Sequence, residues 1–300
     1  MERVTLIERH AKSLVNFQGS LIEALLAEGH EVHAIGPEAD RAPLDWLSAR
    51  GVSYHTVPIS RASLDPAQDL STFLAIRSAL LTIQAQVVIA YTVKAVIYGL
   101  LAARQAGVAR RFAMITGLGY AFTDGAASIK RPLVGAIARR LYRFSLRSAE
   151  AVIFQNPDDL AAFQRLRLIA PYSRTGIVNG SGVDVEHFGL VPLPRDPACL
   201  MISRLVADKG VGEYLAAARI VKAVRPDVVF RLVGPSDPNP AALPPALLET
   251  AVIDGMVEYL GETQDVRPAI ASANIDVLPS YREGTPRSVL EAMAMGRPVV

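Results

Sequence analysis

The sequence has one cysteine, nearly balanced charge and no long apolar run, and each absence excludes a class of protein. Cys199 alone cannot form an internal disulfide, which suits a reducing compartment such as the cytoplasm. A formal net charge of +2 over 300 residues gives no overall basis for binding nucleic acid. No segment is long and apolar enough to span a membrane, and the charged start Met1–His10 is no signal peptide. These features predict a cytoplasmic protein.

Two common ligand-binding patterns are also missing. The G-x-G-x-x-G pattern of dinucleotide-binding loops does not occur. None of the five histidines stands at a metal-ligand spacing, and no Asp-x-Asp pair suits a metal site. We therefore expect neither a dinucleotide cofactor nor a metal.

The length and the order of the patterns predict two α/β domains. A chain of 300 residues, half of them apolar, is long enough for two ordinary cores. Short apolar runs alternate with helical patterns along the whole sequence, as in doubly wound folds. The proline-rich segment 191–197 reads as a connector. We place the first domain at residues 1–190 and the second at residues 191–300.

The first domain opens with a strand, a loop and a helix. Arg3–Ile7 is the expected strand, the following loop contains Asn16–Ser20, and the helix starts at Leu21. Gly19, inside that loop, could let the backbone approach a phosphate, or it could merely ease the entry to the helix.

The stretch Ser280–Pro298 carries the strongest functional signal. It follows a short apolar run that reads as a buried strand. Thr285 is the expected N-cap of the next helix, with proline at its first position and Gly296 at its end. Glu283 then lies in a loop at the carboxyl end of the strand, and Glu291 on the second helical turn. The free N–H groups of the helix N-terminus favour a phosphate, and a carboxylate one turn deeper can accept two sugar hydroxyls.

The run E-G-T-P-R-S-V-L-E-A-M-A-M-G-R-P-V-V closely resembles the signature of the retaining glycosyltransferases of family 4. These enzymes have the two-domain GT-B fold and use nucleotide-sugar donors. The resemblance implies that Glu283 positions or stabilises the donor sugar and that Glu291 holds the ribose hydroxyls. Gly284 and Thr285, beside them, are expected to contact the donor.

A second phrase, Ser203–Gly210, places two cations between a strand and a helix. Arg204 and Lys209 stand in an order that resembles the S/G-R-L-x-x-x-K-G of family 4, where this pair holds the donor diphosphate. Taken alone, they could equally be surface residues near a helix cap. The resemblance also implies donor contacts for Gly19 and Gly234. Two fixed cations could replace a divalent metal, so we expect metal-independent catalysis.

The acceptor side is expected at the carboxyl ends of strands in the first domain. The words Y-T-V-K-A-V-I-Y-G and T-G-L-G-Y-A-F-T look like those of family 4 enzymes that build lipid-linked oligosaccharides and capsular or O-antigen chains. They place Lys94, Thr116, Gly117 and Gly119 near this site. Many family members carry a histidine where this chain has Thr116-Gly117, which weighs against a histidine contact.

The segment Lys130–Arg147 is basic and partly apolar. It holds six lysines and arginines, no acid, and interleaved aromatic residues. It could be a core helix with a solvated basic face, or a patch that lies on the anionic headgroups of the inner membrane surface.

The resulting hypothesis is a retaining glycosyltransferase, peripheral on the cytoplasmic face of the membrane. It would transfer a sugar from a UDP donor to a polyprenyl-diphosphate-linked saccharide. A nucleotide-sugar 2-epimerase of the same fold is an alternative, as are a two-lobed small-molecule binding protein and a nucleotide-binding but inactive fragment. Because Pro298–Val300 reads as the opening of an unfinished strand, we expect the natural protein to continue.

Overall fold

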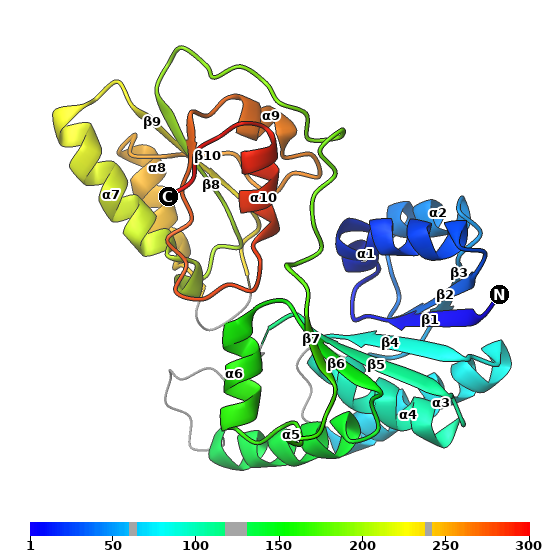
Figure 1. Cartoon of the computed structure of the whole chain (residues 1–300). Coiled ribbons are helices and arrows are strands. Elements are labelled where there is room, and N and C mark those ends of the chain that lie inside the picture. The colour runs from blue at the N-terminus through cyan, green and yellow to red at the C-terminus, as the bar shows by residue number, and fades with distance from the viewer. Residues whose placement is uncertain (60–64, 118–130, 238–241) are drawn as a thin grey trace. The chain divides into compact units, whose positions relative to one another are not determined.

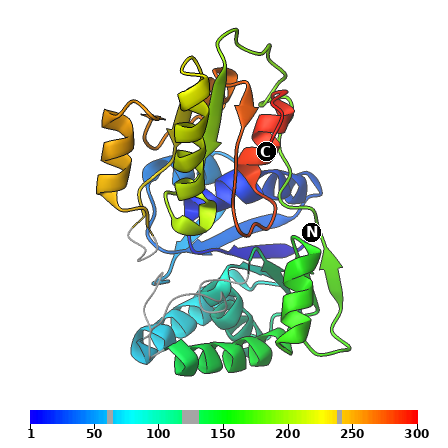
Figure 2. The same ribbon diagram turned by 90° about the vertical axis from the view of Figure 1, so that its left-hand side faces the viewer.

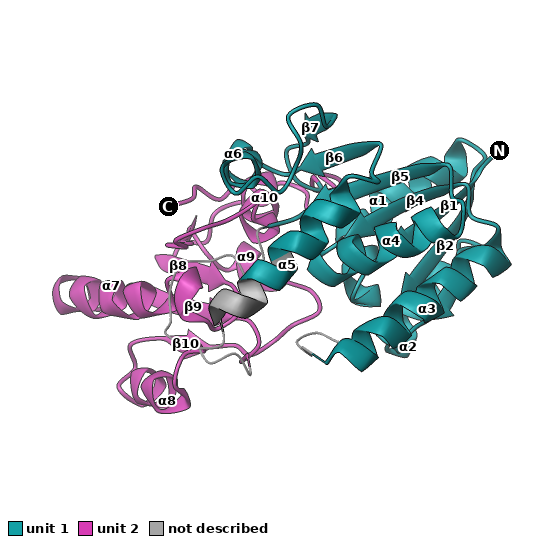
Figure 3. Ribbon diagram, turned by 90° about the horizontal axis from the view of Figure 1, so that it is seen from below, with its two compact units in different colours: residues 1–181 teal, residues 182–300 magenta. Residues whose placement is uncertain are grey.

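The structure is a computed structural model that describes residues 1–59, 65–117, 131–237 and 242–300. These residues form two compact units, Met1–Ser181 (unit 1) and Gly182–Val300 (unit 2), coloured separately in Figure 3. The observed boundary follows Ser181, nine residues before the boundary that we expected after residue 190. Both units combine parallel strands with helices, in agreement with the alternating pattern of the sequence.

Unit 1 is built on a seven-stranded sheet in the order β3-β2-β1-β4-β5-β6-β7 (Figure 1). All of its strand pairs are parallel. The strands are β1 (Arg3–Ile7), β2 (Glu31–Gly36), β3 (Ser53–Thr56), β4 (Val87–Tyr91), β5 (Arg110–Ile115), β6 (Ala151–Phe154) and β7 (Thr175–Ile177). The chain order reverses between β1 and β4, so the topological switch point of this sheet lies outside the carboxyl ends of these two strands.

The helices of unit 1 cover both faces of this sheet. Helices α1 and α2 lie on one face, and α3, α4 and α5 lie on the other (Figure 2). The helices are α1 (Ala11–Ala27), α2 (Arg41–Ser48), α3 (Pro66–Ile83), the π-helix η1 (Ala95–Gly99), α4 (Leu100–Gln105), α5 (Arg131–Leu146) and α6 (Pro157–Arg165). Helix α1 begins at Ala11, so the predicted loop over Asn16–Ser20 is wrong.

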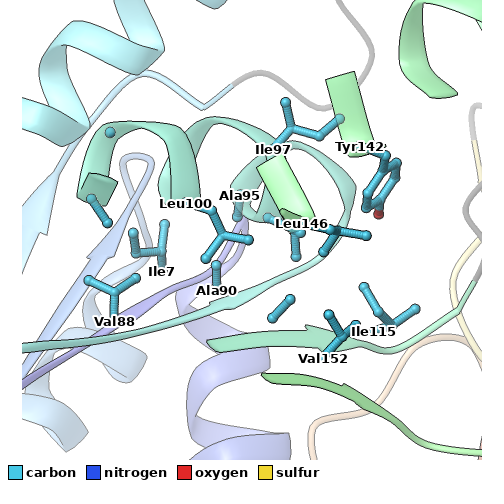
Figure 4. Close-up of a cluster of buried hydrophobic side chains, with 14 of the residues drawn as sticks. Ile7, Val88, Ala90, Ala95, Ile97, Leu100, Ile115, Tyr142, Leu146 and Val152 are labelled. Carbon is cyan, nitrogen blue, oxygen red and sulfur yellow. The ribbon is translucent and has the colours of Figure 1, made fainter. Parts of the chain in front are cut away.

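The core of unit 1 follows from the alternation of side chains along each strand. Leu6 points to the face covered by α1, where it packs with Leu14. Its neighbour Ile7 points to the opposite face, where it belongs to the same buried cluster as Leu100 and Tyr142 from the helices there (Figure 4). The sheet is therefore buried on both sides, as parallel sheets require.

Unit 2 is built on a four-stranded parallel sheet in the order β10-β9-β8-β11. Its strands are β8 (Ala198–Ile202), β9 (Val229–Val233), β10 (Glu258–Tyr259) and β11 (Ile275–Asp276). Its helices are the 3-10 helix η3 (Ala207–Lys209), α7 (Val211–Val224), α8 (Pro245–Ile253), α9 (Arg267–Ala271) and α10 (Arg287–Ala294). Met201 packs toward Tyr214 of α7, and Leu200 packs toward Ala292 of α10, so this sheet too has two apolar faces.

Candidate active site

The predicted donor residues gather at the carboxyl edge of the unit 2 sheet, the edge at which its parallel strands end. Arg204 follows β8, Gly234 follows β9, and Glu283 lies in the segment after β11. This is the edge at which open α/β sheets bind their ligands.

Lys209 and Glu283 form an ion pair across this edge. Lys209 Nζ lies 2.5 Å from Glu283 Oε1, and both side chains are mostly buried. The backbone brings them together, because the Tyr281 N–H donates to the Asp208 carbonyl over 3.1 Å. Gly210 is required here: it has φ +75°, and a Cβ at this position would lie 2.1 Å from the Pro279 carbonyl oxygen. The two residues that the sequence placed 74 positions apart therefore meet.

Arg204, the second predicted cation, also has a carboxylate partner. Its Nη1 donates to Asp237 Oδ2 over 2.8 Å. Asp237 lies in the segment after β9, and the sequence analysis did not single it out. Gly234, which we expected to line the donor site, has φ +142° and stands where this segment meets the backbone of Ser203.

Glu291 lies on the second turn of α10, as predicted, and is 9% exposed. Arg287, one turn earlier, donates from Nε to Glu291 Oε1 over 2.7 Å. Burial raises the pKa of Glu291, and the positive charge of Arg287 opposes this rise. The helix begins at Arg287 with Pro286 in the N-cap position, so the prediction that Thr285 caps it is wrong by one residue. Gly284 and Thr285 lie just before that cap, beside Glu283.

Asp276 is a buried carboxyl that the sequence analysis counted as part of an apolar strand. It is 2% exposed, and neither of its carboxylate oxygens has a hydrogen-bond partner among the described residues. Burial, together with the negative charge of Glu291, raises the pKa of Asp276 to about 7. The one signal in the sequence was an acid within an otherwise apolar run.

The acceptor-side residues follow the strands of unit 1, as predicted, but Lys94 is already paired. Lys94 Nζ lies 2.6 Å from Asp69 Oδ1, and the Tyr98 hydroxyl donates to Asp69 Oδ2 over 2.6 Å. Thr116 and Gly117 come directly after β5. Gly119 and Lys130 lie outside the described residues.

Gly19 sits in the middle of α1 rather than in a loop. It is buried, and a Cβ at this position would lie 3.4 Å from the ring of Trp46. Its smallness serves the packing of α1 against α2, and the expectation of a backbone loop at this glycine does not hold.

The loop after β1 consists instead of Glu8, Arg9 and His10, at the switch point of the unit 1 sheet. Glu8 is 3% exposed and accepts a hydrogen bond from the Arg9 N–H over 2.6 Å. Burial raises the pKa of Glu8 to about 7, against the lowering effect of this hydrogen bond. Across the switch point, Thr92 has φ +65°, a strained value for a β-branched residue, and the π-helix η1 follows it. The sequence analysis missed this cluster.

Neither a metal cluster nor a membrane-spanning helix is present in the described part of the chain. No three side chains of His, Cys, Asp or Glu gather there in a way that could hold a metal ion. No helix within those ranges is long and apolar enough to cross a membrane.

Family models match both units. The model described as "Glycosyl transferase 4-like domain" matches residues 15–180, and that described as "Glycosyl transferases group 1" matches residues 196–300. The chain is 29% identical over 312 residues to the N,N'-diacetylbacillosaminyl-diphospho-undecaprenol alpha-1,3-N-acetylgalactosaminyltransferase of Campylobacter jejuni. That alignment covers 99% of this chain and 80% of the Campylobacter enzyme.

Solved glycosyltransferases share the fold. Sucrose-phosphate synthase from Thermosynechococcus elongatus matches with a TM-score of 0.77 at 20% identity, covering all of this chain and 80% of the synthase. WaaG, a glycosyltransferase involved in lipopolysaccharide biosynthesis, matches with a TM-score of 0.72 at 16% identity over 99% of this chain and 80% of WaaG. Anabaena Alr3699/HepE, solved with UDP and glucose, matches with a TM-score of 0.70 at 17% identity. That match covers all of this chain and 80% of HepE. Since one family model covers more than half of the chain and a second covers most of the remainder, this chain belongs to the family 4 glycosyltransferases of GT-B fold.

Proposed function

We propose that the chain transfers a sugar from a UDP donor to a lipid-linked saccharide, with retention of the anomeric configuration and without a metal. One observation supports the proposed binding of a UDP-sugar donor. Arg204, Lys209 and Glu283 converge at one edge of the unit 2 sheet, and Glu291 lies on the adjoining helix. Two cations and two carboxylates match the two parts of such a donor: an anionic diphosphate and the hydroxyls of its sugars.

The chemistry proposed for these residues is electrostatic. As the acceptor oxygen bonds to the anomeric carbon, the bond from that carbon to the diphosphate oxygen breaks, and negative charge grows on the departing UDP. The proton of the acceptor hydroxyl passes to the departing diphosphate oxygen. Arg204 and Lys209 would neutralise this charge, which is the work that a divalent cation performs in other transferases. Glu283 would position the donor sugar while its contact with Lys209 keeps both groups in place. Glu291, held by Arg287, would accept the two ribose hydroxyls.

The acceptor half rests on the named relative. The Campylobacter enzyme acts, by its name, on a saccharide joined through a diphosphate to undecaprenol. We extend that class, a polyprenyl-diphosphate-linked saccharide, to this chain. Such a substrate is embedded in a membrane, so the enzyme would work at the surface of the inner membrane on its cytoplasmic side.

The surface of α5 supports this location. Ile137, Arg140 and Phe144 are spaced as one helical stripe on α5, Arg147 follows its end, and all four are exposed. On α3, in contact with the neighbouring α4, Leu70 and Leu74 are also exposed. Between these helices lies an open groove of about 350 Å³ lined by Phe73, Leu101, Arg104, Gln105 and Phe144. Apolar side chains interleaved with arginines suit an anionic lipid surface.

The proposed reaction is tested by supplying donor and acceptor in the presence of EDTA. Purified protein is incubated with UDP-sugars and a synthetic polyprenyl-diphosphate saccharide, and the product is analysed by mass spectrometry and NMR. An acceptor one sugar heavier with a new α linkage is expected. UDP released without any acceptor would instead indicate the epimerase, and activity that requires an added divalent cation would contradict the metal-free mechanism.

The proposed membrane surface has a separate test. Flotation with vesicles containing anionic lipid should recover the protein, and vesicles of neutral lipid should recover much less. Phe144→Ser combined with Arg140→Glu should abolish flotation, whereas Arg225→Glu, an exposed charge change in unit 2, should not. Equal flotation of both variants would refute a role for this surface.

A further inference from the structure

The segment that follows β9 runs alongside the turn that carries Arg204. The Leu205 N–H donates to the Pro235 carbonyl over 3.1 Å, and Leu205 pairs with Ser236 in a parallel bridge. The approach is so close at Gly234 that a Cβ there would lie 1.8 Å from the Ser203 carbonyl oxygen. The Tyr259 hydroxyl donates to the Gly234 carbonyl over 2.8 Å and holds the segment from its other side. The position of residue 237 relative to Arg204 is therefore fixed by the backbone.

Asp237 stands at the end of this braced segment, and its contact with Arg204 is asymmetric. The Asp237 side chain is 4% exposed, whereas that of Arg204 is 50% exposed. Asp237 receives a hydrogen bond from one guanidinium nitrogen, Nη1. A guanidinium has five N–H donors in a rigid plane, so this contact leaves others to turn toward an anion.

We propose that Asp237 is a positioning residue for the transfer reaction. Its buried carboxylate holds the guanidinium of Arg204 in one orientation. The exposed N–H groups of that guanidinium then already face the position of the departing diphosphate. This inference rests on the proposed role of Arg204 and adds a residue that neither the sequence motifs nor the comparisons assign. A long arginine side chain otherwise samples many rotamers, and each must be given up when the transition state forms.

A competing account makes the opposite prediction. If Asp237 were only a counter-ion that the donor must displace, removing its charge would free Arg204 and tighten nucleotide binding. If Asp237 positions Arg204, removing its charge slows turnover, because catalysis depends on charges that are already oriented.

The experiment compares four single variants and one double variant. Asp237→Asn keeps the shape and removes the charge, and Asp237→Glu keeps the charge. Arg204→Ala defines the loss of the cation itself, alone and combined with Asp237→Asn. Asp227→Asn is the matched control, because Asp227 forms an exposed ion pair with Arg225 in the same unit at 2.6 Å. For each protein we would measure kcat and KM for the UDP-sugar and the Kd of UDP in EDTA, with thermal unfolding as the check of folding.

Asp237→Asn should lower kcat roughly 10- to 100-fold with a much smaller change in KM. Asp237→Glu should recover part of this loss, and Asp227→Asn should match the wild type. Asp237→Asn should add nothing to Arg204→Ala, because the carboxylate acts through the arginine.

Unchanged or faster turnover in Asp237→Asn, tighter binding of UDP, or full additivity with Arg204→Ala would overturn the positioning role. These outcomes are distinct from failure of the proposed function. If Arg204→Ala itself keeps wild-type turnover, the role of Arg204 falls and this inference falls with it. If Arg204→Ala is impaired while folded Asp237→Asn is not, only the positioning role fails.

Discussion

The two units share an architecture but present different chemistry at the carboxyl edges of their sheets. In unit 2 this edge bears two ion pairs, Arg204 with Asp237 and Lys209 with Glu283. In unit 1 the switch point bears the buried carboxyl of Glu8 and the strained Thr92. The same framework of parallel strands thus supports two different sets of side chains at its carboxyl edge.

The difference follows from the segments after the strands rather than from the strands. Parallel sheets with two buried faces leave only their strand ends free for ligands. Unit 2 uses those ends to gather charges, which suits a diphosphate. In unit 1, Lys94 pairs with Asp69, which also accepts a hydrogen bond from the Tyr98 hydroxyl, so these residues offer a hydrogen-bonding network rather than an open positive charge. Such a network suits the uncharged hydroxyls of a saccharide.

The largest effect should come from adding one methyl group at a glycine of unit 2. Gly234 and Gly117 each follow a strand and have φ values of +142° and +150°. A Cβ at Gly234 would lie 1.8 Å from the Ser203 carbonyl oxygen, whereas at Gly117 it meets no described atom within 4 Å. Gly234→Ala should therefore lower the free energy of unfolding by more than about 4 kcal/mol, and Gly117→Ala by about 1–3 kcal/mol.

Hydrogen exchange with mass spectrometry can assign each of these losses to its unit. Peptides of unit 2 should lose protection in Gly234→Ala, and peptides of unit 1 should lose less in Gly117→Ala. Equal losses would mean that backbone strain, rather than the close approach to Ser203, governs both positions.

The next largest effect distinguishes the roles of two cations, Arg204 in unit 2 and Lys94 in unit 1. Arg204→Ala should lower kcat by about 10²- to 10³-fold, because the departing diphosphate loses a preorganised charge. Lys94→Ala should instead raise the KM for the acceptor and leave the KM for the donor unchanged. Steady-state kinetics with each substrate varied in turn measures both values of KM. A raised KM for the donor in Lys94→Ala would contradict the assignment of the acceptor to unit 1 and of the donor to unit 2.

A third effect concerns the buried carboxyls, one in each unit. Burial raises the pKa of Glu8 from 4.5 to about 7 and the pKa of Asp276 from 3.8 to about 7. The folded state therefore binds more protons than the unfolded chain between about pH 4 and 7, and stability falls as pH rises through this window. The full loss, on the order of 3 kcal/mol for Glu8 and 4 kcal/mol for Asp276, is present above pH 7.

Glu8→Gln and Asp276→Asn do not titrate at these positions, so each should flatten the pH dependence of stability. Urea unfolding at pH 5, 6, 7 and 8 measures the slope. Because Glu8 accepts the Arg9 N–H and Asp276 has no partner among the described residues, the two absolute stabilities should differ even where the slopes agree. An unchanged slope in either variant would show that the corresponding carboxyl of the wild type is already ionised in the folded state at pH 5.

The smallest effect concerns nucleotide binding by one carboxylate of each unit, Glu291 in unit 2 and Glu8 in unit 1. Glu291→Gln should weaken UDP binding by about 2 kcal/mol, or roughly 30-fold, because a charged acceptor of two hydroxyls becomes a neutral one. Glu8→Gln should leave the Kd of UDP unchanged. Isothermal titration calorimetry measures both, and equal weakening would contradict the assignment of the nucleotide to unit 2.

The sequence predicted unit 2 better than unit 1 because its signals are local. Strand β8, helix α7 and the end of α10 at Gly296 follow from apolar runs, helical spacing and a glycine with φ +82°. The motif residues Arg204, Lys209, Glu283 and Glu291 all lie within a few residues of a strand end or a helix start.

The residues that the sequence analysis missed depend on contacts between distant segments. Asp237 meets Arg204 across 33 positions, and the close packing of Gly234 on Ser203 helps to bring them together. Glu8 looked like part of a charged start, although it is buried in the structure. The prediction for Gly19 failed for a related reason. The sequence alone does not distinguish a glycine that packs against a tryptophan inside a helix from a glycine in a phosphate-binding loop.

The central claim is tested most directly by titrating UDP and uridine into the wild-type protein and the double variant Arg204→Ala/Lys209→Ala. Both proteins are titrated in EDTA, and the wild type also in Mg²⁺. We predict that the wild type binds UDP equally well in EDTA and in Mg²⁺. The double variant should bind UDP at least about 100-fold more weakly, with the affinity for uridine unchanged. Loss of wild-type UDP binding in EDTA, or UDP binding that survives in the double variant, would contradict the account.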